Sequence, residues 1–279
     1  MKLDKLNILV PTDFSNNAWS ATTYALNLFV ENDCTFYFLN SLSLSHADSR
    51  TYITTRYVDV LTETSKRELN EWKTRVANLG NAKHKFEVIS TSEDITPALA
   101  RAVKRYSIDL VVAGTKGATG VNKFFLGSNT VKIIQEMDSC ALLAVPDNYV
   151  YAAPKHIAFP TDFNREYTEA EIGTLLNFAK LNDAHIYVVH INLQSELTEV
   201  QQENMRILQS HLEQQEHTFH WIEKSKTKAE DIHAFIEEFK IDVLAMVHYK
   251  HSFIENLMKE PVIKNIGFKP TVPFLVIPQ

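Results

Sequence analysis

Residues 110–130 read LVVAGTKGATGVNKFFLGSNT, an apolar strand followed by a glycine-bearing loop and the start of a helix. Gly114 and Gly117 lie in the loop, and Gly127 and Ser128 open the helix. A glycine lets backbone N–H groups approach an anion where a Cβ would block them, and the free amides at a helix start add the positive end of a dipole. This stretch therefore predicts a cradle for a phosphate group, with a nucleotide or another phosphorylated small molecule as the ligand.

The spacing of the glycines separates this motif from two widespread phosphate-binding loops. A Walker A loop requires Gly-x-x-x-x-Gly-Lys followed by Ser or Thr, and a dinucleotide fingerprint requires Gly-x-Gly-x-x-Gly near the first strand. The chain has neither, and carries instead Gly114-x2-Gly117-x9-Gly127-Ser128. The register of this motif is therefore more informative than its number of glycines.

A second motif, ILVPTDFS at residues 8–15, ends the first predicted strand. The two motifs together resemble the universal stress protein family, whose ATP-binding members carry Gly-x2-Gly-x9-Gly-Ser/Thr and an Asp just after the first strand. The resemblance implies an α/β domain with a parallel sheet in the strand order 3-2-1-4-5. Ligands of such sheets bind outside the carboxyl ends of the strands where the order reverses, here between the first and fourth strands. The resemblance thus implies ATP or a related adenine nucleotide, alone or with Mg²⁺.

The chain contains this unit twice. KLNILVPTDFS at residues 5–15 reappears as KHIAFPTDFN at residues 155–164, and self-similarity at a fixed offset indicates duplicated units. Alternating strands and helices predict a doubly wound parallel sheet in each copy. We expect one domain over residues 1–147 with the intact motif and a second over residues 151–279 with a degenerate one. The resemblance implies that the two pair as a pseudo-dimer within the chain.

Apolar periodicity predicts the further elements of both copies. In the first copy, the predicted helices cover 16–30, 54–79 and 96–106, and the strands 35–39, 85–90, 109–113 and 141–145. In the second copy, the predicted helices cover 166–181, 198–215 and 229–239, and the strands 185–190, 218–223, 242–247 and 273–277. A further helix is expected before the last strand of each copy.

Asp13 is the predicted contact to the nucleoside, because the resemblance gives this position that contact and a carboxylate accepts hydrogen bonds from nucleoside donors. The structural alternative is a helix cap, which Asp13 and Ser15 both suit. Lys116 can reach a phosphate as a point charge or remain solvated. For the glycines the alternative is a tight loop joined to a capped helix, which needs fewer glycines and no particular register. The predicted nucleotide-binding residues are Pro11, Thr12, Asp13, Leu39, Asn40, Gly114, Lys116, Gly117, Gly127, Ser128, Asn129 and Thr130.

The second copy keeps the first turn, with Thr161 and Asp162, but loses the cradle. Glu260 would place a negative charge where a phosphate should bind, and Pro261 has no N–H to donate. We therefore expect no nucleotide in this half. Alignment of the fourth strands places Val247, Lys250, Glu260 and Pro261 at the positions of Gly114, Gly117, Gly127 and Ser128.

Composition narrows the classes of partner. The net charge of -6 and the lack of a Lys and Arg cluster argue against nucleic acid. No apolar run approaches the ~20 residues that a bilayer requires, and no leader precedes the first strand, so we expect no membrane partner. Two cysteines provide no disulfide framework, which suits a reducing cytoplasm. The sequence thus predicts a soluble cytoplasmic protein.

Nine of the eleven histidines lie in the second half, among them His217, His220, His248 and His251. His217 and His220 are three apart on a predicted strand and point to opposite faces, and no ligand set is recognisable beside them. We expect no metal, and interpret this region as a histidine-rich surface that can respond to pH.

Signatures of enzymes are missing from the sequence, so no catalytic residues are assigned and at most slow ATP hydrolysis is expected. The leading hypothesis is a nucleotide-responsive stress factor that acts through an unknown protein partner, with a homodimer as a further association. Two alternatives are an interaction scaffold that binds no nucleotide and a slow ATP-hydrolysing enzyme.

Overall fold

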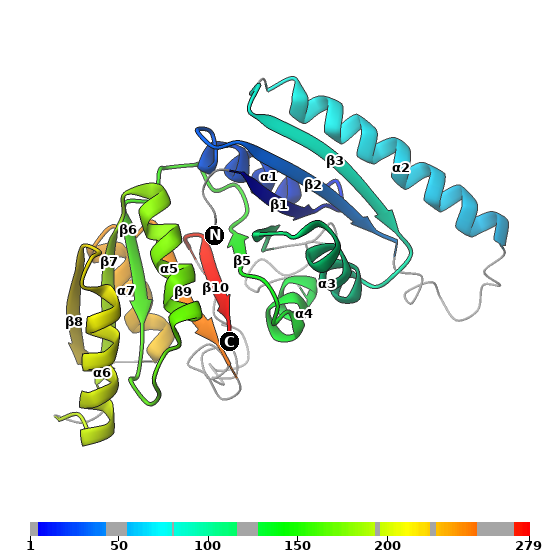
Figure 1. The fold of residues 1–279 in the computed structure, drawn as a ribbon. Helices are drawn as coiled ribbons and strands as arrows, with labels where there is room; N and C mark the ends of the chain where they lie inside the picture. The colour runs from blue at the N-terminus through cyan, green and yellow to red at the C-terminus, as the bar shows by residue number, and fades with distance from the viewer. Residues whose placement is uncertain are drawn as a thin grey trace. The chain divides into compact units, whose positions relative to one another are not determined.

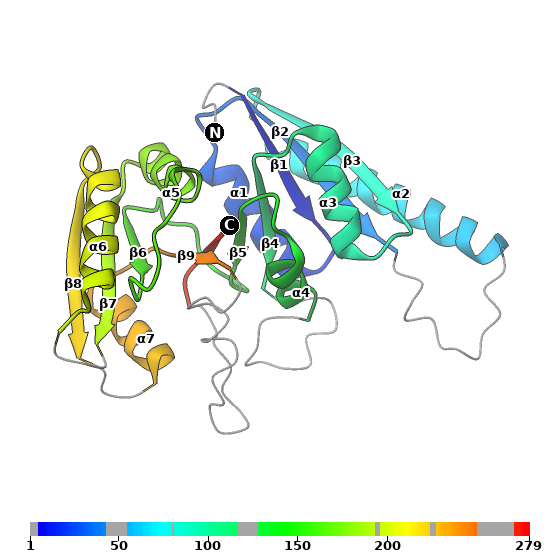
Figure 2. The same cartoon turned by 60° about the horizontal axis from the view of Figure 1, so that its bottom comes forward.

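The computed structural model describes residues 5–42, 55–79, 81–115, 128–192, 196–223, 227–249 and 271–279. The chain forms two compact units, and the chain passes from one to the other after Val150. Each is a parallel sheet with helices packed on it (Figures 1 and 2). Among the helices that the structure describes, none combines the length and the apolar character required to cross a membrane.

The first unit alternates strands and helices along the chain. Its elements are β1 (Leu6–Pro11), α1 (Asn16–Leu28), β2 (Cys34–Ser41), α2 (Thr55–Ala77), β3 (His84–Thr91), α3 (Ile95–Tyr106), β4 (Leu110–Gly114), α4 (Ser128–Glu136) and β5 (Leu142–Val145). The strands are parallel and lie in the order β3-β2-β1-β4-β5. The predicted order 3-2-1-4-5 is therefore confirmed, and the carboxyl ends of β1 and β4 are neighbours at its reversal.

Helices on both faces explain why β1, β4 and β5 are mostly apolar and buried. Leu9, Val111 and Leu143, from β1, β4 and β5, are fully buried. On one face, α1 and α2 meet where the rings of Trp19 and Trp72 lie 5.1 Å apart. On the other face, α3 and α4 contact each other (Figures 1 and 2). This packing leaves the loops at the carboxyl ends of the strands as the place for a site.

The second unit has the same plan. Its described elements are β6 (His156–Pro160), α5 (Glu169–Asn182), β7 (His185–Asn192), α6 (Glu199–Leu212), β8 (His217–Glu223), α7 (Lys228–Glu238), β9 (Val243–His248) and β10 (Phe274–Pro278). These strands are parallel in the order β8-β7-β6-β9-β10. The reversal again lies between the first and fourth strands, β6 and β9.

Helix α5 begins at Glu169, so the predicted start at residue 166 is wrong. The reason is a reciprocal cap. The Thr168 side chain accepts a hydrogen bond from the Glu171 N–H at 3.3 Å, and the Glu171 carboxylate accepts one from the Thr168 N–H at 2.7 Å. Such a capping box satisfies amide donors that the first helical turn leaves unpaired. The preceding residues therefore remain a loop.

The other predicted helices and strands differ from the observed bounds by three residues or fewer. The largest of these differences is the end of α6, at Leu212 in place of residue 215. The helix predicted before the last strand of the first copy is α4. Its counterpart in the second copy falls within residues 250–270, which lie outside the described residues.

Candidate functional site

The turn after β1 has a well-defined backbone. The Thr12 N–H donates to the Leu39 carbonyl at 2.8 Å, and the Thr12 hydroxyl oxygen accepts from the Phe14 N–H at 3.0 Å. Phe14 has a φ of 62°, in the left-handed region that non-glycine residues rarely adopt. The turn directly follows Pro11, the last residue of β1. It therefore lies at the reversal point of the sheet, where the sequence predicts the site.

Asp13 is the exposed residue of this turn. Its Oδ1 accepts a hydrogen bond from the Ser15 N–H at 3.1 Å. The N-cap of α1 is Ser15, whose Oγ accepts from the Ala18 N–H at 3.2 Å. Of the two capping candidates, Ser15 thus caps the helix, and Asp13 places a carboxylate just before the positive end of α1.

Leu39 and Asn40 lie at the end of β2 and hydrogen-bond to the backbone of Thr12 in the turn after β1. Leu39 is 1% exposed, and its carbonyl holds Thr12. Asn40 is also buried, and its Nδ2 donates to the Thr12 carbonyl at 2.8 Å. The Asn40 Oδ1 accepts from the Ser65 hydroxyl at 2.9 Å. The structure therefore gives the side chain of Asn40 partners within the protein.

Gly114 ends β4 directly against helix α1. A Cβ at this position would lie 2.3 Å from Nδ2 and 2.7 Å from Cγ of Asn17, which is buried. The lack of a side chain at Gly114 is thus required by internal packing, whether or not an anion approaches. The Gly114 carbonyl accepts from the Thr130 hydroxyl at 2.9 Å, which ties the first turn of α4 to β4.

The described residues bring eight predicted site residues to the carboxyl ends of the strands: Pro11, Thr12 and Asp13 at the end of β1, Leu39 and Asn40 near the end of β2, Gly114 at the end of β4, and Asn129 and Thr130 in the first turn of α4. Asn129 lies in that turn and is exposed. Lys116, Gly117 and Gly127 lie outside the described residues, and of Ser128 the structure describes the helical backbone. These positions stay predictions of the sequence.

The second unit repeats the turn closely. The Thr161 hydroxyl oxygen accepts from the Phe163 N–H at 3.1 Å, and Asp162 Oδ1 accepts from the Asn164 N–H at 3.1 Å. Phe163 has a φ of 54°. His190 takes the place of Asn40, because its Nδ1 lies 2.9 Å from the Thr161 carbonyl. The carbonyl can only accept, so this ring nitrogen carries the proton.

The loop between β6 and α5 is longer than the loop between β1 and α1, and it adds a charged side chain, Arg165, to the second unit. Thr168 caps α5 seven residues after Thr161, whereas Ser15 caps α1 three residues after Thr12. The longer loop supplies Arg165, whose Nη2 donates to Glu171 Oε1 at 2.5 Å and whose Nη1 donates to Glu171 Oε2 at 3.1 Å.

The Arg165 guanidinium also lies 4.0 Å from the ring centroid of Tyr249, the residue that follows β9. Burial raises the pKa of Tyr249, so its ring carries no charge near neutral pH. Arg165 therefore connects the loop after β6 to the end of β9. Val247, at the aligned position of Gly114, is buried in β9, and Lys250, Glu260 and Pro261 lie outside the described residues.

The histidines of the second unit include a linked pair that sequence reasoning missed. Thr218 Oγ1 lies 3.0 Å from His185 Nε2 and 2.9 Å from His220 Nε2. Burial lowers the pKa of both histidines. Cross-strand pairing of β7 with β8 was the signal that could have placed them together. Within the part of the chain that the structure describes, no three His, Cys, Asp or Glu side chains are arranged to hold a metal ion.

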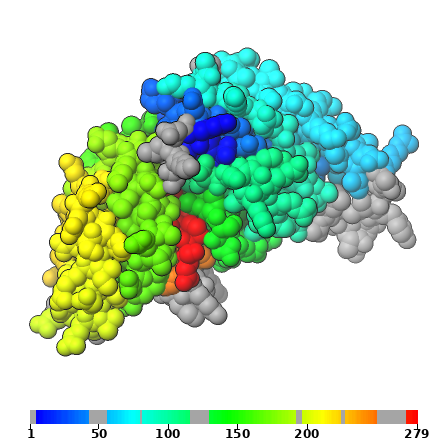
Figure 3. Space-filling view, in the orientation of Figure 1, coloured from blue at the N-terminus to red at the C-terminus, as the bar shows by residue number. Residues whose placement is uncertain are grey.

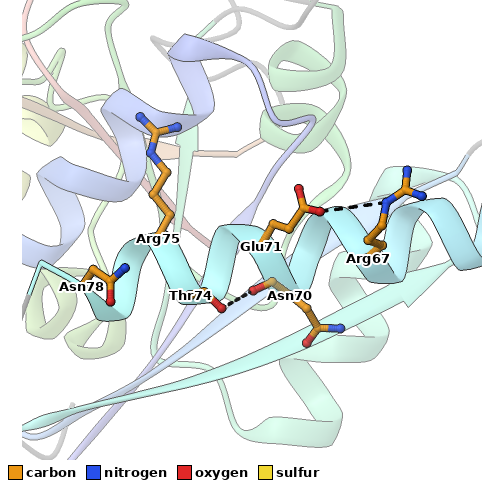
Figure 4. Close-up of a pocket in the computed structure, with 6 residues that line it drawn as sticks. All are labelled: Arg67, Asn70, Glu71, Thr74, Arg75 and Asn78. Atoms are coloured by element: carbon orange, nitrogen blue, oxygen red, sulfur yellow. Dashed lines mark hydrogen bonds and ion pairs between the residues drawn. The ribbon is translucent and has the colours of Figure 1, made fainter.

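A shallow hollow of about 660 Å³ lies on the outer face of α2 (Figure 4). The helix runs along the surface of the first unit, in cyan in Figure 3. Arg67 Nε and Glu71 Oε1 are 4.0 Å apart there, and the Arg75 guanidinium lies 3.5 Å from the Trp19 ring centroid. None of the predicted site residues lines this hollow. Its lining is Arg67, Asn70, Glu71, Thr74, Arg75 and Asn78.

Comparison with known proteins agrees with this fold. The universal stress protein family matches residues 6–146. The structure of a universal stress protein from Archaeoglobus fulgidus DSM 4304 is similar, with a TM-score of 0.71 and 17% identity over 98% of this chain and 96% of that chain. A functionally unknown protein from Pseudomonas aeruginosa PAO1 has a TM-score of 0.57 and 11% identity over 98% of this chain and 92% of that chain. A search of curated proteins found no match.

The fold defines a tandem α/β protein whose two units have parallel sheets of the same strand order. The chain belongs to the universal stress protein family.

Proposed function

We propose that the first unit binds ATP or a related adenine nucleotide at the carboxyl ends of β1 and β4, and that the protein acts as a nucleotide-responsive stress factor in the cytoplasm. The supporting observation is the convergence of the Asp13 turn, the end of β4 and the first turn of α4 at the reversal point of the sheet. Open parallel sheets bind their ligands at this point.

Each part of the edge has a distinct role in this proposal. The exposed Asp13 carboxylate accepts hydrogen bonds from the nucleoside. Backbone amides of Gly117, Gly127 and Ser128, together with those of Asn129 and Thr130 in the first turn of α4, receive the phosphates. The N-terminal end of a helix favours negative charge, which a triphosphate supplies. Mg²⁺, when bound with ATP, would neutralise part of the phosphate charge.

In the second unit, the positive charge near the strand ends is already paired within the protein. Its β6 and β9 ends are joined by the Arg165 side chain, which is already paired with the buried Glu171 carboxylate. The positive charge that could attract a phosphate is thereby neutralised within the protein. We therefore propose one nucleotide per chain.

Matched aspartate variants test the site. Asp13→Asn keeps the size of the side chain but removes its charge and one acceptor, and should weaken ATP binding by about tenfold. Asp162→Asn makes the same change in the repeated turn of the second unit and should leave affinity unchanged. Isothermal titration of each nucleotide-free variant with ATP and Mg²⁺ measures both. Equal affinities for Asp13→Asn and the wild type would contradict the assignment.

A further inference from the structure

We propose that Ser65 and Ser90 are positioning residues of the first unit, which act through Asn40 to fix the Thr12 backbone and so the direction of Asp13. The inference rests on the nucleotide site proposed above, and adds residues that lie behind it. Neither serine belongs to the phosphate motif or to the turn.

The contacts form one continuous chain. Ser90 Oγ lies 2.9 Å from Ser65 Oγ, and Ser65 Oγ donates to Asn40 Oδ1 at 2.9 Å. Asn40 Nδ2 then donates to the Thr12 carbonyl at 2.8 Å. Ser65 is 1% exposed, Thr12 5% and Asn40 7%. Water therefore has little access to the three buried members, whereas Ser90 is half-buried.

The number of available protons fixes the direction of every bond. The Thr12 carbonyl can only accept, so the amide nitrogen of Asn40 faces it and the amide oxygen faces Ser65. Ser65 has one hydroxyl proton, and it donates this proton in the hydrogen bond to Asn40 Oδ1. The hydrogen bond between the two serines must then be donated by Ser90. A single arrangement satisfies all four groups, which makes the Thr12 carbonyl position sensitive to the far end of the chain.

The chain connects four elements that are distant in sequence. Thr12 follows β1, Asn40 lies in β2, Ser65 lies in α2 and Ser90 lies in β3. Asn40 and Ser90 are neighbours in the register of β2 and β3. Helix α2 is therefore coupled to the orientation of the turn that carries Asp13.

The second unit keeps the last bond and loses the rest. His190 Nδ1 replaces the amide of Asn40 on the Thr161 carbonyl. Its neighbour in the register is Trp221, whose ring centroid lies 5.3 Å from that of His190. An aromatic contact thus stands where the first unit has a hydroxyl pair. The complete polar chain occurs in the unit whose phosphate motif is intact.

Ser65→Ala tests this coupling. The change leaves the buried Asn40 Oδ1 without its donor, so the Thr12 turn loses its fixed position. We expect about tenfold weaker binding of adenosine and of ATP alike, because the nucleoside end is affected. Ser90→Ala should show a smaller loss in the same direction, and Ser65→Thr, which keeps the hydroxyl, should restore most of the affinity. Thr62→Ala is the matched control, since that hydroxyl on the same helix donates to the Val58 carbonyl.

Amide hydrogen exchange separates this inference from the function on which it rests. In Ser65→Ala the Phe14 amide should exchange faster, while the Phe163 amide of the second unit should be unchanged. Unchanged exchange at Phe14 would overturn the inference, and so would wild-type affinity in both Ser65→Ala and Ser90→Ala. If the wild type binds no nucleotide, the proposed function fails, and exchange at Phe14 still decides whether Ser65 holds the turn.

Discussion

Gly114 has a packing role that its place in the sequence motif does not reveal. Its place in the motif indicates close approach of an anion, yet in the structure the side chain of Asn17 fills the space in front of it. Asn17 and Gly114 are far apart in sequence, so no local pattern could reveal this contact. The position is therefore constrained by packing as well as by any ligand.

Gly114→Ala should destabilise the first unit. The added Cβ would lie 2.3 Å from Nδ2 of the buried Asn17 and 3.0 Å from its carbonyl oxygen, so the Asn17 side chain must move within the core. Overpacking of this kind costs about 1–3 kcal/mol in the free energy of unfolding. Urea denaturation followed by circular dichroism measures the loss.

Gly173 provides the control for this substitution. It lies in α5 of the second unit, and among the described residues nothing beyond the helix's own backbone lies within 4 Å of an added Cβ. Gly173→Ala should therefore stabilise its unit by about 0.5–1 kcal/mol through helix propensity. If Gly114→Ala were as harmless as Gly173→Ala, the close packing of Asn17 would be contradicted.

The roles of Asn40 and Ser65 could not be predicted from the sequence for a similar reason. The motif and the resemblance placed Asn40 near the ligand, because it ends the second strand. The hydrogen bond that Asn40 receives from Ser65 depends on how α2 packs on β2, and helical periodicity alone does not identify the partner of a small polar residue. The packing of α2 on the sheet brings Ser65 within hydrogen-bond distance of Asn40, behind the Thr12 turn.

At the scale of elements, strand pairing creates the histidine pair of β7 and β8. The Thr218 hydroxyl has one proton, so it can donate to at most one of the two rings, and at least one of His185 and His220 donates to it through Nε2. Phe235 of α7 lies on the His220 ring, with centroids 5.3 Å apart. Burial therefore disfavours the charged form of both rings and lowers their pKa.

Stability of the second unit should fall as the pH drops below about 6.5, the ordinary pKa of histidine. A lowered pKa in the folded state means that the unfolded chain binds protons first. The contribution of these histidines to the free energy of unfolding is therefore fully present above this pH, and it is lost as the pH falls below it. Urea midpoints between pH 7.5 and pH 5.5 measure the slope.

His185→Gln isolates the contribution of the pair. The half-buried His233 of the second unit also has a pKa lowered by burial, and adds to the slope in the same direction. The variant should therefore retain part of the pH dependence and lose the part due to His185. A slope identical to that of the wild type would contradict the role of the histidine pair.

The starts of several helices can be predicted from local sequence patterns. Three helices of the second unit begin with a capping box, after Thr168, Thr198 and Thr227. Each has Glu or Gln three residues later, so these starts are readable in the sequence. The predicted start of α5, residue 166, lies three residues before the observed start at Glu169, in the loop that carries Arg165. Strand order, in contrast, followed correctly from the family resemblance and the alternation of strands and helices.

At the scale of the whole molecule, the two units share a strand order and a first turn but differ at the ends of their strands. Beside this shared turn, the sequence of the first unit carries the glycine motif. The second unit has Arg165, Glu171 and Tyr249 in a connected cluster. We therefore expect two similar sheets and one nucleotide site in each chain.

The most direct test is the number of adenine nucleotides bound per chain. The purified protein is denatured, the released nucleotide is identified by mass spectrometry, and the stripped protein is titrated with ATP and Mg²⁺. We expect about one equivalent per chain, and none in Gly117→Val, because a side chain at this position blocks the backbone approach to the phosphate. No nucleotide released and none rebound, or two equivalents per chain, would contradict it.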